Sequence, residues 1–253
     1  MSERLQTALF RRNPVGAAAL TLVGLGLGVW GVVNSPIFGV DRIRVEGARE
    51  MSGDEVRALA AVEPGTNLLR LSLDEVAAAM ERSPWIRQAA ADRSLPTTLV
   101  LRIAERRAVG WVEDPAGLAV VADDGTVVDR AESAPRNLPG LGAAPELLEP
   151  GERLGGVVTL RVAASMGEGL LATVASVAQV DGELVLALRD GGDVRYGRAD
   201  HLMEKNLALA EMLAWAGERE VGVEYIDVRI PSAPALRPVG LTASGPAGSV
   251  PDL

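Results

Sequence analysis

A run of nineteen residues without a charge constrains this chain more than any other feature. It extends from Val15 to Val33, with a pair of arginines shortly before it and Pro36 shortly after it. A helix of about 19 residues at 1.5 Å per residue is about 28 Å long, close to the hydrocarbon thickness of a bilayer. Because a helix also satisfies its own backbone hydrogen bonds in lipid, the run predicts a transmembrane helix over residues 14–34.

A cleavable secretory signal is the alternative explanation of the same run. The run exceeds a typical signal core, no Ala-x-Ala site follows it, and Pro36 would make cleavage after Ser35 unfavourable. Arginines are almost equally frequent near the two ends, but the nearest pair, Arg11 and Arg12, precedes the run. We therefore expect an uncleaved anchor with a cytoplasmic tail at residues 1–13 and an external body.

Composition limits what the body can do. The formal net charge is −9, and residues 1–13 hold three arginines and one glutamate, which leaves −11 on the remainder. An acidic body does not neutralise phosphates, so a nucleic-acid partner is not expected. The chain has no cysteine and one histidine, His201, which excludes disulfides and thiolate-bound metals. No cofactor and no metal site is predicted.

The residues after the run predict a small α+β domain. Ser52 and Ser72 each precede a glutamate by three residues, the spacing of a capping box at a helix start. Period-two alternation predicts strands before and after the two helices. The predicted elements, in the order strand, helix, helix, strand, strand, are 38–47, a helix after Ser52, Leu73–Glu81, 89–93 and 99–104.

Five short motifs accompany this order of elements. They are Phe38-x-Val-x-x-Ile-x-Val-x-Gly47, Pro64-Gly-x-Asn-Leu68, Ser83-Pro-Trp-Ile86, Arg93-x-x-Pro-x-Thr-Leu99 and Ile103-x-Glu-Arg106. In this order, directly after one anchor, they resemble the POTRA domain of the bacterial cell-division family FtsQ, also called DivIB. The resemblance implies a POTRA domain over residues 36–106.

Several residues that invite a functional interpretation have simpler structural ones. Trp85 is predicted to be a buried core anchor, and Glu105 and Arg106 to be solvated charges or a local ion pair. Asp123 and Asp124 precede Gly125 and an alternating apolar run, which predicts a hairpin turn and not a metal or acid-base site.

The rest of the chain predicts a mixed and antiparallel β domain with two helices, over residues 107–231, followed by a Pro- and Gly-rich tail at 232–253. Its second helix is expected to be capped by Asp200 and to end near Gly217. His201 is interpreted as a surface residue. The predicted apolar side of this helix consists of Leu202, Leu207, Ala210, Leu213 and Ala214. The other predicted elements are strands at 109–112, 118–122, 127–128, 174–180, 183–189, 193–197 and 223–230 and a weak helix at 157–171.

This second domain also resembles the FtsQ family. Tyr196-Gly-Arg198 with Glu204-Lys205 is similar to the strand-to-helix segment of the family, and Tyr-x-Asp-x-Arg at 225–229 to its terminal strand. Ile230 stands where many members have tyrosine. The ending after Pro231 is typical of actinobacterial members.

The predicted terminal strand, 223–230, is interpreted as an interface. Its alternation places Ile226, Val228 and Ile230 on the core side and Tyr225, Asp227 and Arg229 on the open face. A strand at the edge of a sheet has unpaired N–H and C=O groups and accepts another chain by β-augmentation. The resemblance implies that this strand and the preceding helix bind the division subunit FtsB/DivIC, which associates with FtsL. The candidate partner-binding residues are Arg198, Tyr225, Asp227, Arg229 and Ile230. The alternative is that Asp227 and Arg229 only solvate the edge and deter aggregation.

No catalytic constellation is present in the sequence, so the predicted function is that of a single-pass scaffold at the division septum and not that of an enzyme. A membrane-anchored envelope enzyme or its ligand-binding accessory is one alternative. It would require Asp123, Asp124, Asp190 and Asp193 to meet around one pocket. A POTRA chaperone of outer-membrane transport is the other, and the lack of a barrel or of repeated POTRA units argues against it.

Overall fold

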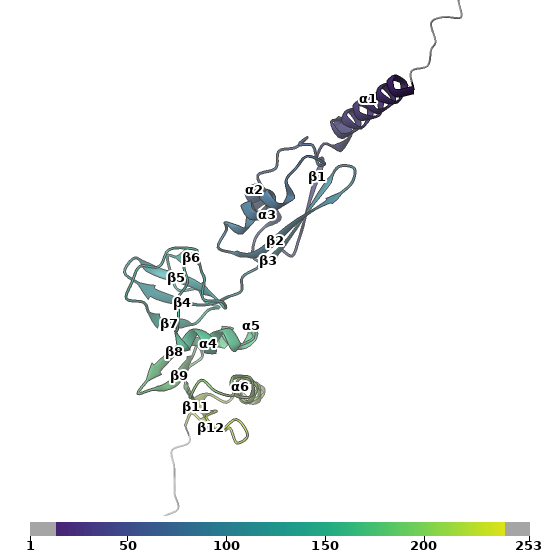
Figure 1. Ribbon diagram of the computed structural model, residues 1–253. Coiled ribbons are helices and arrows are strands. Elements are labelled where there is room, and N and C mark those ends of the chain that lie inside the picture. The colour runs from purple at the N-terminus through teal and green to yellow at the C-terminus, as the bar shows by residue number, and fades with distance from the viewer. Residues whose placement is uncertain (1–13, 241–253) are drawn as a thin grey trace, which may run out of the picture. The chain divides into compact units, whose positions relative to one another are not determined.

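The computed structural model describes residues 14–240, without the side chains of residues 14–20 and 29. The chain divides into two compact units, residues 1–105 and 106–253, whose elements are labelled in Figure 1. The predicted cytoplasmic tail at 1–13 and the last part of the predicted C-terminal tail, 241–253, lie outside the described residues.

The charge-free run forms a helix, α1 (Pro14–Val33). This agrees with the helical part of the prediction for residues 14–34. In the part of the chain that the structure describes, no helix meets the requirements of length and apolar character for crossing a membrane.

The remainder of the first unit has the predicted order strand, helix, helix, strand, strand. In its three-stranded sheet β3 lies in the centre, parallel to β1 and antiparallel to β2. The two helices pack on this sheet around a core that includes Val56, Leu68, Met80, Ile86 and Leu99. The elements are η1 (Pro36–Phe38), β1 (Arg42–Glu46), α2 (Gly53–Ala60), α3 (Leu73–Glu81), β2 (Ile86–Ser94) and β3 (Thr98–Glu105).

The predicted helix starts are confirmed by their caps. Ser52 and Glu55 form a complete capping box at α2, and Ser72 accepts the backbone N–H of Glu75 at α3. The prediction for Trp85 was wrong, because this side chain is only half-buried. It lies in the turn before β2, and Ile86, the first residue of that strand, fills the core instead, at 1% exposure.

Glu105 has a structural role that the sequence did not reveal. Its carboxylate accepts the backbone N–H groups of Arg49, Glu50 and Met51 at 3.1, 2.8 and 3.1 Å. These bonds hold the segment that enters α2 against the end of β3. The expectation of a solvated charge or a local pair was therefore wrong for Glu105, because its partners lie more than fifty positions away in the sequence.

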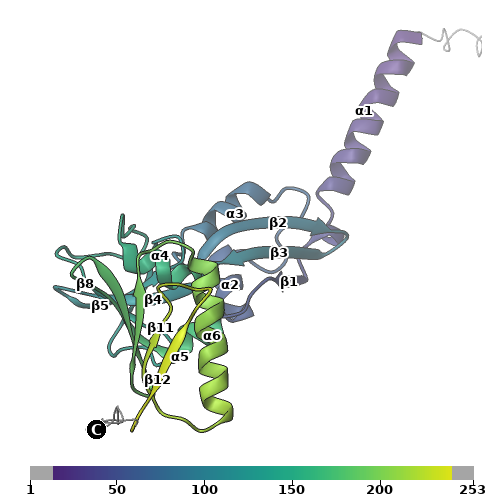
Figure 2. The same cartoon turned by 90° about the horizontal axis from the view of Figure 1, so that it is seen from below.

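The second unit contains, within the described residues, one nine-stranded sheet in the order β12-β11-β10-β9-β8-β7-β4-β5-β6. The helices are α4 (Val158–Ser165), α5 (Glu168–Thr173) and α6 (Leu202–Glu218), and α6 lies beside β11 and β12 (Figure 2). The strands are β4 (Ala108–Asp114), β5 (Gly117–Ala122), β6 (Val127–Ala131), β7 (Gly140–Ala143), β8 (Val174–Val180), β9 (Glu183–Leu188), β10 (Asp193–Gly197), β11 (Val223–Asp227) and β12 (Ala235–Pro238).

The predicted hairpin after Asp123 is confirmed. Gly125, in the left-handed region at φ +86°, turns the chain between the antiparallel strands β5 and β6. Burial by itself would raise the pKa of Asp124, but the backbone N–H of Thr126 and the guanidinium of Arg106 both donate to its carboxylate and lower the pKa to about 2. Arg106 thus forms a partly buried ion pair inside the second unit.

The start and end of α6 differ from the prediction. His201 occupies the N-cap position in a left-handed conformation, at φ 46°, and it has no side-chain capping bond. Asp200, the predicted cap, instead binds Lys205 through its carboxylate. Gly217 lies inside the helix, which ends at Glu218. The cap assignments for Asp200 and Gly217 were therefore wrong, although the helix ends within one residue of the predicted position.

The predicted terminal strand is not the edge of the sheet. It ends at Asp227, and the segment assigned to the tail contributes β12, which pairs antiparallel with β11. On its other side β11 pairs in parallel with β10. The edge strand at this end of the sheet is therefore β12, and β6 is the edge strand at the other end. This segment was predicted to belong to the tail because it contains two prolines and its apolar stretch is too short to show the alternation of a strand.

Candidate partner-binding surface

The helix α6 turns polar residues toward the inside of the second unit. Lys205 and Asn206 are buried, at 1% and 8% exposure, beside Leu209. The opposite face carries a stripe of exposed apolar residues at the helical spacing i, i+4, i+7 and i+11, formed by Met203, Leu207, Ala210 and Ala214. The predicted apolar side was thus wrong for three of its five residues, namely Leu207, Ala210 and Ala214.

A hydrogen-bond network explains why Asn206 can occupy a core position. Its side-chain oxygen accepts the hydroxyl of the fully buried Tyr196 at 2.9 Å. Its amide nitrogen donates to the backbone oxygen and the hydroxyl of Ser165 at 3.0 and 2.9 Å. The network joins β10, α6 and the end of α4. Burial raises the pKa of Tyr196, so the hydroxyl remains a donor at physiological pH.

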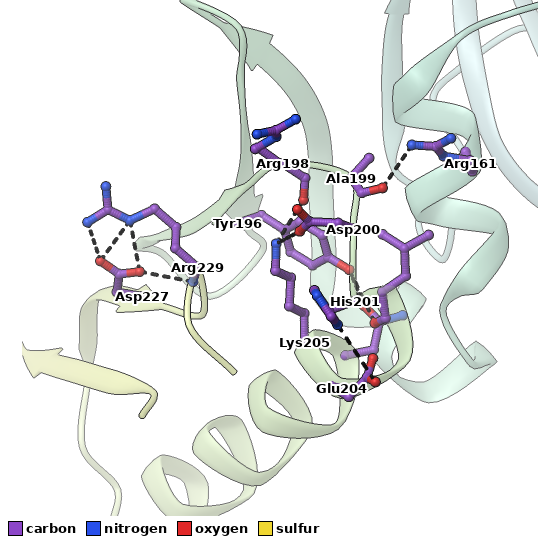
Figure 3. Close-up of polar contacts among 12 residues, drawn as sticks. Arg161, Tyr196, Arg198, Ala199, Asp200, His201, Glu204, Lys205, Asp227 and Arg229 are labelled. Atoms are coloured by element: carbon purple, nitrogen blue, oxygen red, sulfur yellow. Dashed lines mark hydrogen bonds and ion pairs between the residues drawn. The ribbon is translucent and has the colours of Figure 1, made fainter. Parts of the chain in front are cut away.

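Lys205 fixes the turn that leads from β10 into α6. Its ammonium donates to the backbone oxygen of Arg198 at 2.8 Å and to the carboxylate of Asp200 at 2.7 Å (Figure 3). It also lies 5.3 Å from the centre of the Tyr196 ring. The hydrogen bond from Lys205 lowers the pKa of Asp200. The contacts of Lys205 with Arg198 and Asp200 therefore hold the first turn of α6 next to β10.

Tyr225 lies on β11 and is half-buried. The guanidinium of Arg195, on the neighbouring strand β10, stacks 4.0 Å from the centre of the Tyr225 ring. Ile226, the next residue along β11, is fully buried. The predicted alternation along this strand is thus correct for these two residues.

Asp227 and Arg229 form an ion pair at the end of β11. The Nη2 and Nε atoms of Arg229 lie 2.6 and 3.1 Å from the carboxylate of Asp227, as Figure 3 shows. This hydrogen bond lowers the pKa of Asp227 and raises that of Arg229. The aliphatic stem of Arg229 crosses Gly197, where a β-carbon would lie 2.8 Å from Cγ of Arg229. Gly197 is also left-handed, at φ +72°.

The other two candidate residues lie apart from this pair. Arg198 is exposed, and its guanidinium points away from Arg229 in Figure 3. Ile230 lies after the end of β11 and is 64% exposed, which corrects its predicted place in the core beside Val228. The structure therefore brings Tyr225, Asp227 and Arg229 onto one strand end, whereas Arg198 and Ile230 flank it.

Exposed apolar side chains gather around the same part of the second unit. Between residues 106 and 240, all of which the structure describes, seven large hydrophobic residues are strongly exposed. Two of them are elsewhere, Leu147 and Val180. The other five lie on α6, in the loop after β11 and just after β12: Met203, Leu207, Trp215, Ile230 and Val239. Among these five, only Ile230 was a predicted partner-binding residue. Leu207 was predicted on the apolar side of α6, and Met203, Trp215 and Val239 were not predicted from the sequence.

The alternative site made of four aspartates is not formed. Asp124 binds Arg106 and the Thr126 backbone at the β5–β6 hairpin, whereas Asp193 begins β10 at the other end of the strand order. No group of three or more potential metal ligands occurs in the described residues. A shallow pocket of about 520 Å³ lies between β7, β8 and the start of α4, lined by residues such as Leu141, Val158 and Gln179.

Parts of this chain match known proteins. Residues 38–106 match the model of the POTRA domain of FtsQ type. The cell division protein FtsQ of Mycolicibacterium smegmatis is 33% identical to this chain over 227 residues, which cover 87% of this chain and 63% of that protein. The chain is thus similar to the FtsQ proteins.

Other FtsQ sequences match different shares of the chain. The FtsQ of Streptomyces collinus is 29% identical over 240 residues, which cover 90% of this chain and 89% of that protein. The FtsQ of Anaeromyxobacter sp. (strain K) is 38% identical over 129 residues, which cover 51% of this chain and 44% of that protein. The chain thus spans less than two thirds of the Anaeromyxobacter and Mycolicibacterium relatives.

Proposed function

We propose that this chain is a membrane-anchored scaffold of the cell-division machinery, which acts by binding other division proteins and not by catalysis. Its relatives are cell division proteins named FtsQ, and its residues 38–106 match the FtsQ-type POTRA domain. The observation that carries the proposal is the gathering of five of the seven large exposed hydrophobic residues around α6 and β12. Exposed apolar patches of this kind mark surfaces that bind proteins.

The arrangement of this surface fits one mode of binding. β12 has a paired neighbour, β11, on one side only, so its outer edge offers backbone groups to an added strand. The stripe on α6, formed by Met203, Leu207, Ala210 and Ala214, offers an apolar face to a helix. A partner with a strand next to an amphipathic helix would use both features. We propose that this partner is the extracytoplasmic part of FtsB/DivIC, in complex with FtsL.

Arg229 supplies the charge for this surface. Its side chain is 46% exposed, and its Nε and Nη2 atoms are occupied by Asp227. Its Nη1 atom lies 4.0 Å from Glu183, beyond a normal hydrogen bond, and remains available to a partner carboxylate. The ion pair with Asp227 therefore orients the guanidinium and still leaves it a free donor direction. Tyr225, Arg198 and Ile230 would line the same contact.

The proposal includes the membrane anchor. The charge-free run at 15–33, the preceding arginine pair and the similarity of the chain to FtsQ proteins support α1 as a single span with a cytoplasmic N-terminus. The part of the chain after residue 35 would then lie outside the membrane, at the division septum. The POTRA-type segment, residues 38–106, follows α1 directly, and the proposed binding surface lies near the other end of the chain.

Binding of a fluorescently labelled FtsB/DivIC extracytoplasmic fragment to the full chain in nanodiscs tests the proposal. Leu207→Glu places a charge in the apolar stripe, and Arg229→Glu reverses the charge that faces the partner. Both should reduce affinity at least tenfold while the circular dichroism spectrum stays unchanged. Leu147→Glu and Arg136→Glu, at exposed positions away from the surface, are the matched controls and should bind normally. Unchanged affinity of both surface variants would refute the assignment.

A further inference from the structure

Two exposed hydrophobic residues stand out in the first unit. Between residues 34 and 105, all of which the structure describes, only Ile37 and Leu95 are large hydrophobic residues with strong exposure, at 66% and 57%. Ile37 lies in the 3-10 helix η1, and Leu95 lies in the loop that joins β2 to β3. All other large apolar side chains of this segment are buried or half-buried, so these two require an explanation.

The topology of the small sheet places both residues at the same end of the domain. Because β1 and β3 are parallel, Arg42 at the start of β1 pairs with Thr98 at the start of β3, next to the β2–β3 loop. The backbone oxygen of Thr97 accepts the N–H of Asp41 at 2.9 Å. The segment that follows Ile37 therefore runs along the loop that carries Leu95.

The same end of the domain holds the C-terminus of α1. Asn67, in the loop between α2 and α3, donates to the backbone oxygen of Val33 at 2.7 Å, which satisfies one of the last carbonyls of α1. Arg70 donates to the side-chain oxygen of Asn34 at 3.0 Å. Gly39 forms a β-bridge with Asn67. The exposed pair thus lies on the face of the domain from which α1 leaves.

The charged residues on this face include three arginines. Arg42, Arg70 and Arg93 are exposed there, together with the carboxylates of Asp41 and Glu63. Arg93 is held by its Nε atom, which donates to the backbone oxygen of Leu68 at 2.6 Å. Apolar side chains among arginines are the combination that binds the interfacial region of a bilayer with anionic lipids.

We propose that this face of the first unit rests on the bilayer surface from which α1 emerges, with Leu95 and Ile37 inserted among the lipids. The proposal rests on the anchoring role of α1 given above. The contact would give the first unit a second attachment, on the β2–β3 loop, in addition to the covalent link through residues 34–35. Two separate attachments fix the tilt of a domain, whereas one link alone leaves it free to swing.

The absence of cysteine from the sequence allows a clean test. Single cysteines are introduced as Leu95→Cys, Ile37→Cys, Arg82→Cys and Leu25→Cys, and each is labelled with the environment-sensitive dye NBD. The full chain is reconstituted into nanodiscs that contain phosphatidylglycerol, with and without doxyl-labelled lipid. Arg82 follows α3 at the opposite end of the small sheet and is the exposed control, and Leu25 lies within α1 and reports insertion.

The four labelled positions test the lipid contact and the membrane anchor separately. The proposal predicts blue-shifted emission and quenching by doxyl lipid at positions 95, 37 and 25, and neither effect at position 82. Quenching at position 25 without quenching at 95 would refute the surface contact and leave the anchor intact. No quenching at position 25 would refute the anchor itself. A blue shift at 95 without lipid quenching would show that a protein surface covers this loop, which also refutes the proposal.

Discussion

The buried network around Asn206 allows a quantitative prediction for the position of α6. Asn206→Leu keeps a side chain of similar volume and removes three hydrogen bonds, one from Tyr196 and two to Ser165. A buried hydrogen bond contributes about 1 kcal/mol net, and a buried polar group left unpaired costs about 1–3 kcal/mol. The hydroxyl of Tyr196 would lose its 2.9 Å bond to Asn206 and keep a longer contact of 3.4 Å to Leu202. We expect a loss of about 2–4 kcal/mol in local stability.

A substitution of Tyr196, the hydrogen-bond partner of Asn206, tests whether the two side chains act together. Tyr196→Phe alone should cost about 1–2 kcal/mol, because it leaves the Asn206 oxygen without its donor. In the Asn206→Leu background the same change removes a hydroxyl that has already lost its bond to Asn206, so its effect on stability should be close to neutral or stabilising. The double-mutant cycle should therefore give a coupling energy of about 1–2 kcal/mol.

Hydrogen exchange of the α6 amides is the suitable assay. Because the chain has two compact units, one unfolding curve does not isolate this network. A local loss of about 2.8 kcal/mol would raise the exchange rate about 100-fold, since a tenfold change corresponds to 1.4 kcal/mol. Additive effects of the two substitutions, within about 0.5 kcal/mol, would refute the claim that the two side chains act as one network.

Three further substitutions probe other features. Gly197→Ala should lower the free energy of unfolding by about 1–2 kcal/mol, because its backbone is left-handed, and it should also displace the stem of Arg229. Gly182 is also left-handed but has open space around it, so Gly182→Ala should show the backbone effect alone. Thermal denaturation of the two variants compares these losses. For Asp124 the pKa of about 2 lies below the ordinary 3.8, so its carboxylate stabilises the fold above about pH 4 and loses that contribution as pH falls toward 2. The wild-type protein should therefore be about 2 kcal/mol more stable than Asp124→Asn at pH 6, and this difference in the free energy of unfolding should shrink as the pH falls from about 4 toward 2. Glu105→Ala should destabilise the first unit by about 2–3 kcal/mol, measured by urea denaturation, and a loss below 0.5 kcal/mol would contradict its role as a triple acceptor.

The first unit could be predicted closely because its pattern is local. Capping serines three residues before glutamates mark both helix starts, and strand alternation marks β1 and β3. The bonds of Glu105 could not be predicted, since they join positions that only the folded sheet brings together. Trp85 was assigned to the core from its residue type, but its place in the turn before β2 leaves it half-buried.

The candidate surface was less predictable for a physical reason. Lys205 and Asn206 are polar, so a pattern of hydrophobic residues assigns α6 the wrong side, and only their buried partners show that this side faces the sheet. β12 was missed because strand pairing, and not its own alternation, makes it a strand. The residues of β11 itself, Tyr225 and Asp227, were placed correctly because a regular alternation runs through them.

Hydrogen–deuterium exchange of the full chain in nanodiscs, with and without the FtsB/DivIC extracytoplasmic fragment, tests the central claim most directly. The fragment should slow exchange in β12, residues 235–238, because an added strand would form hydrogen bonds with its edge N–H and C=O groups. It should also slow exchange along α6, most strongly around Leu207. Protection confined to the first unit, or to the far edge strand β6, would contradict the proposed surface.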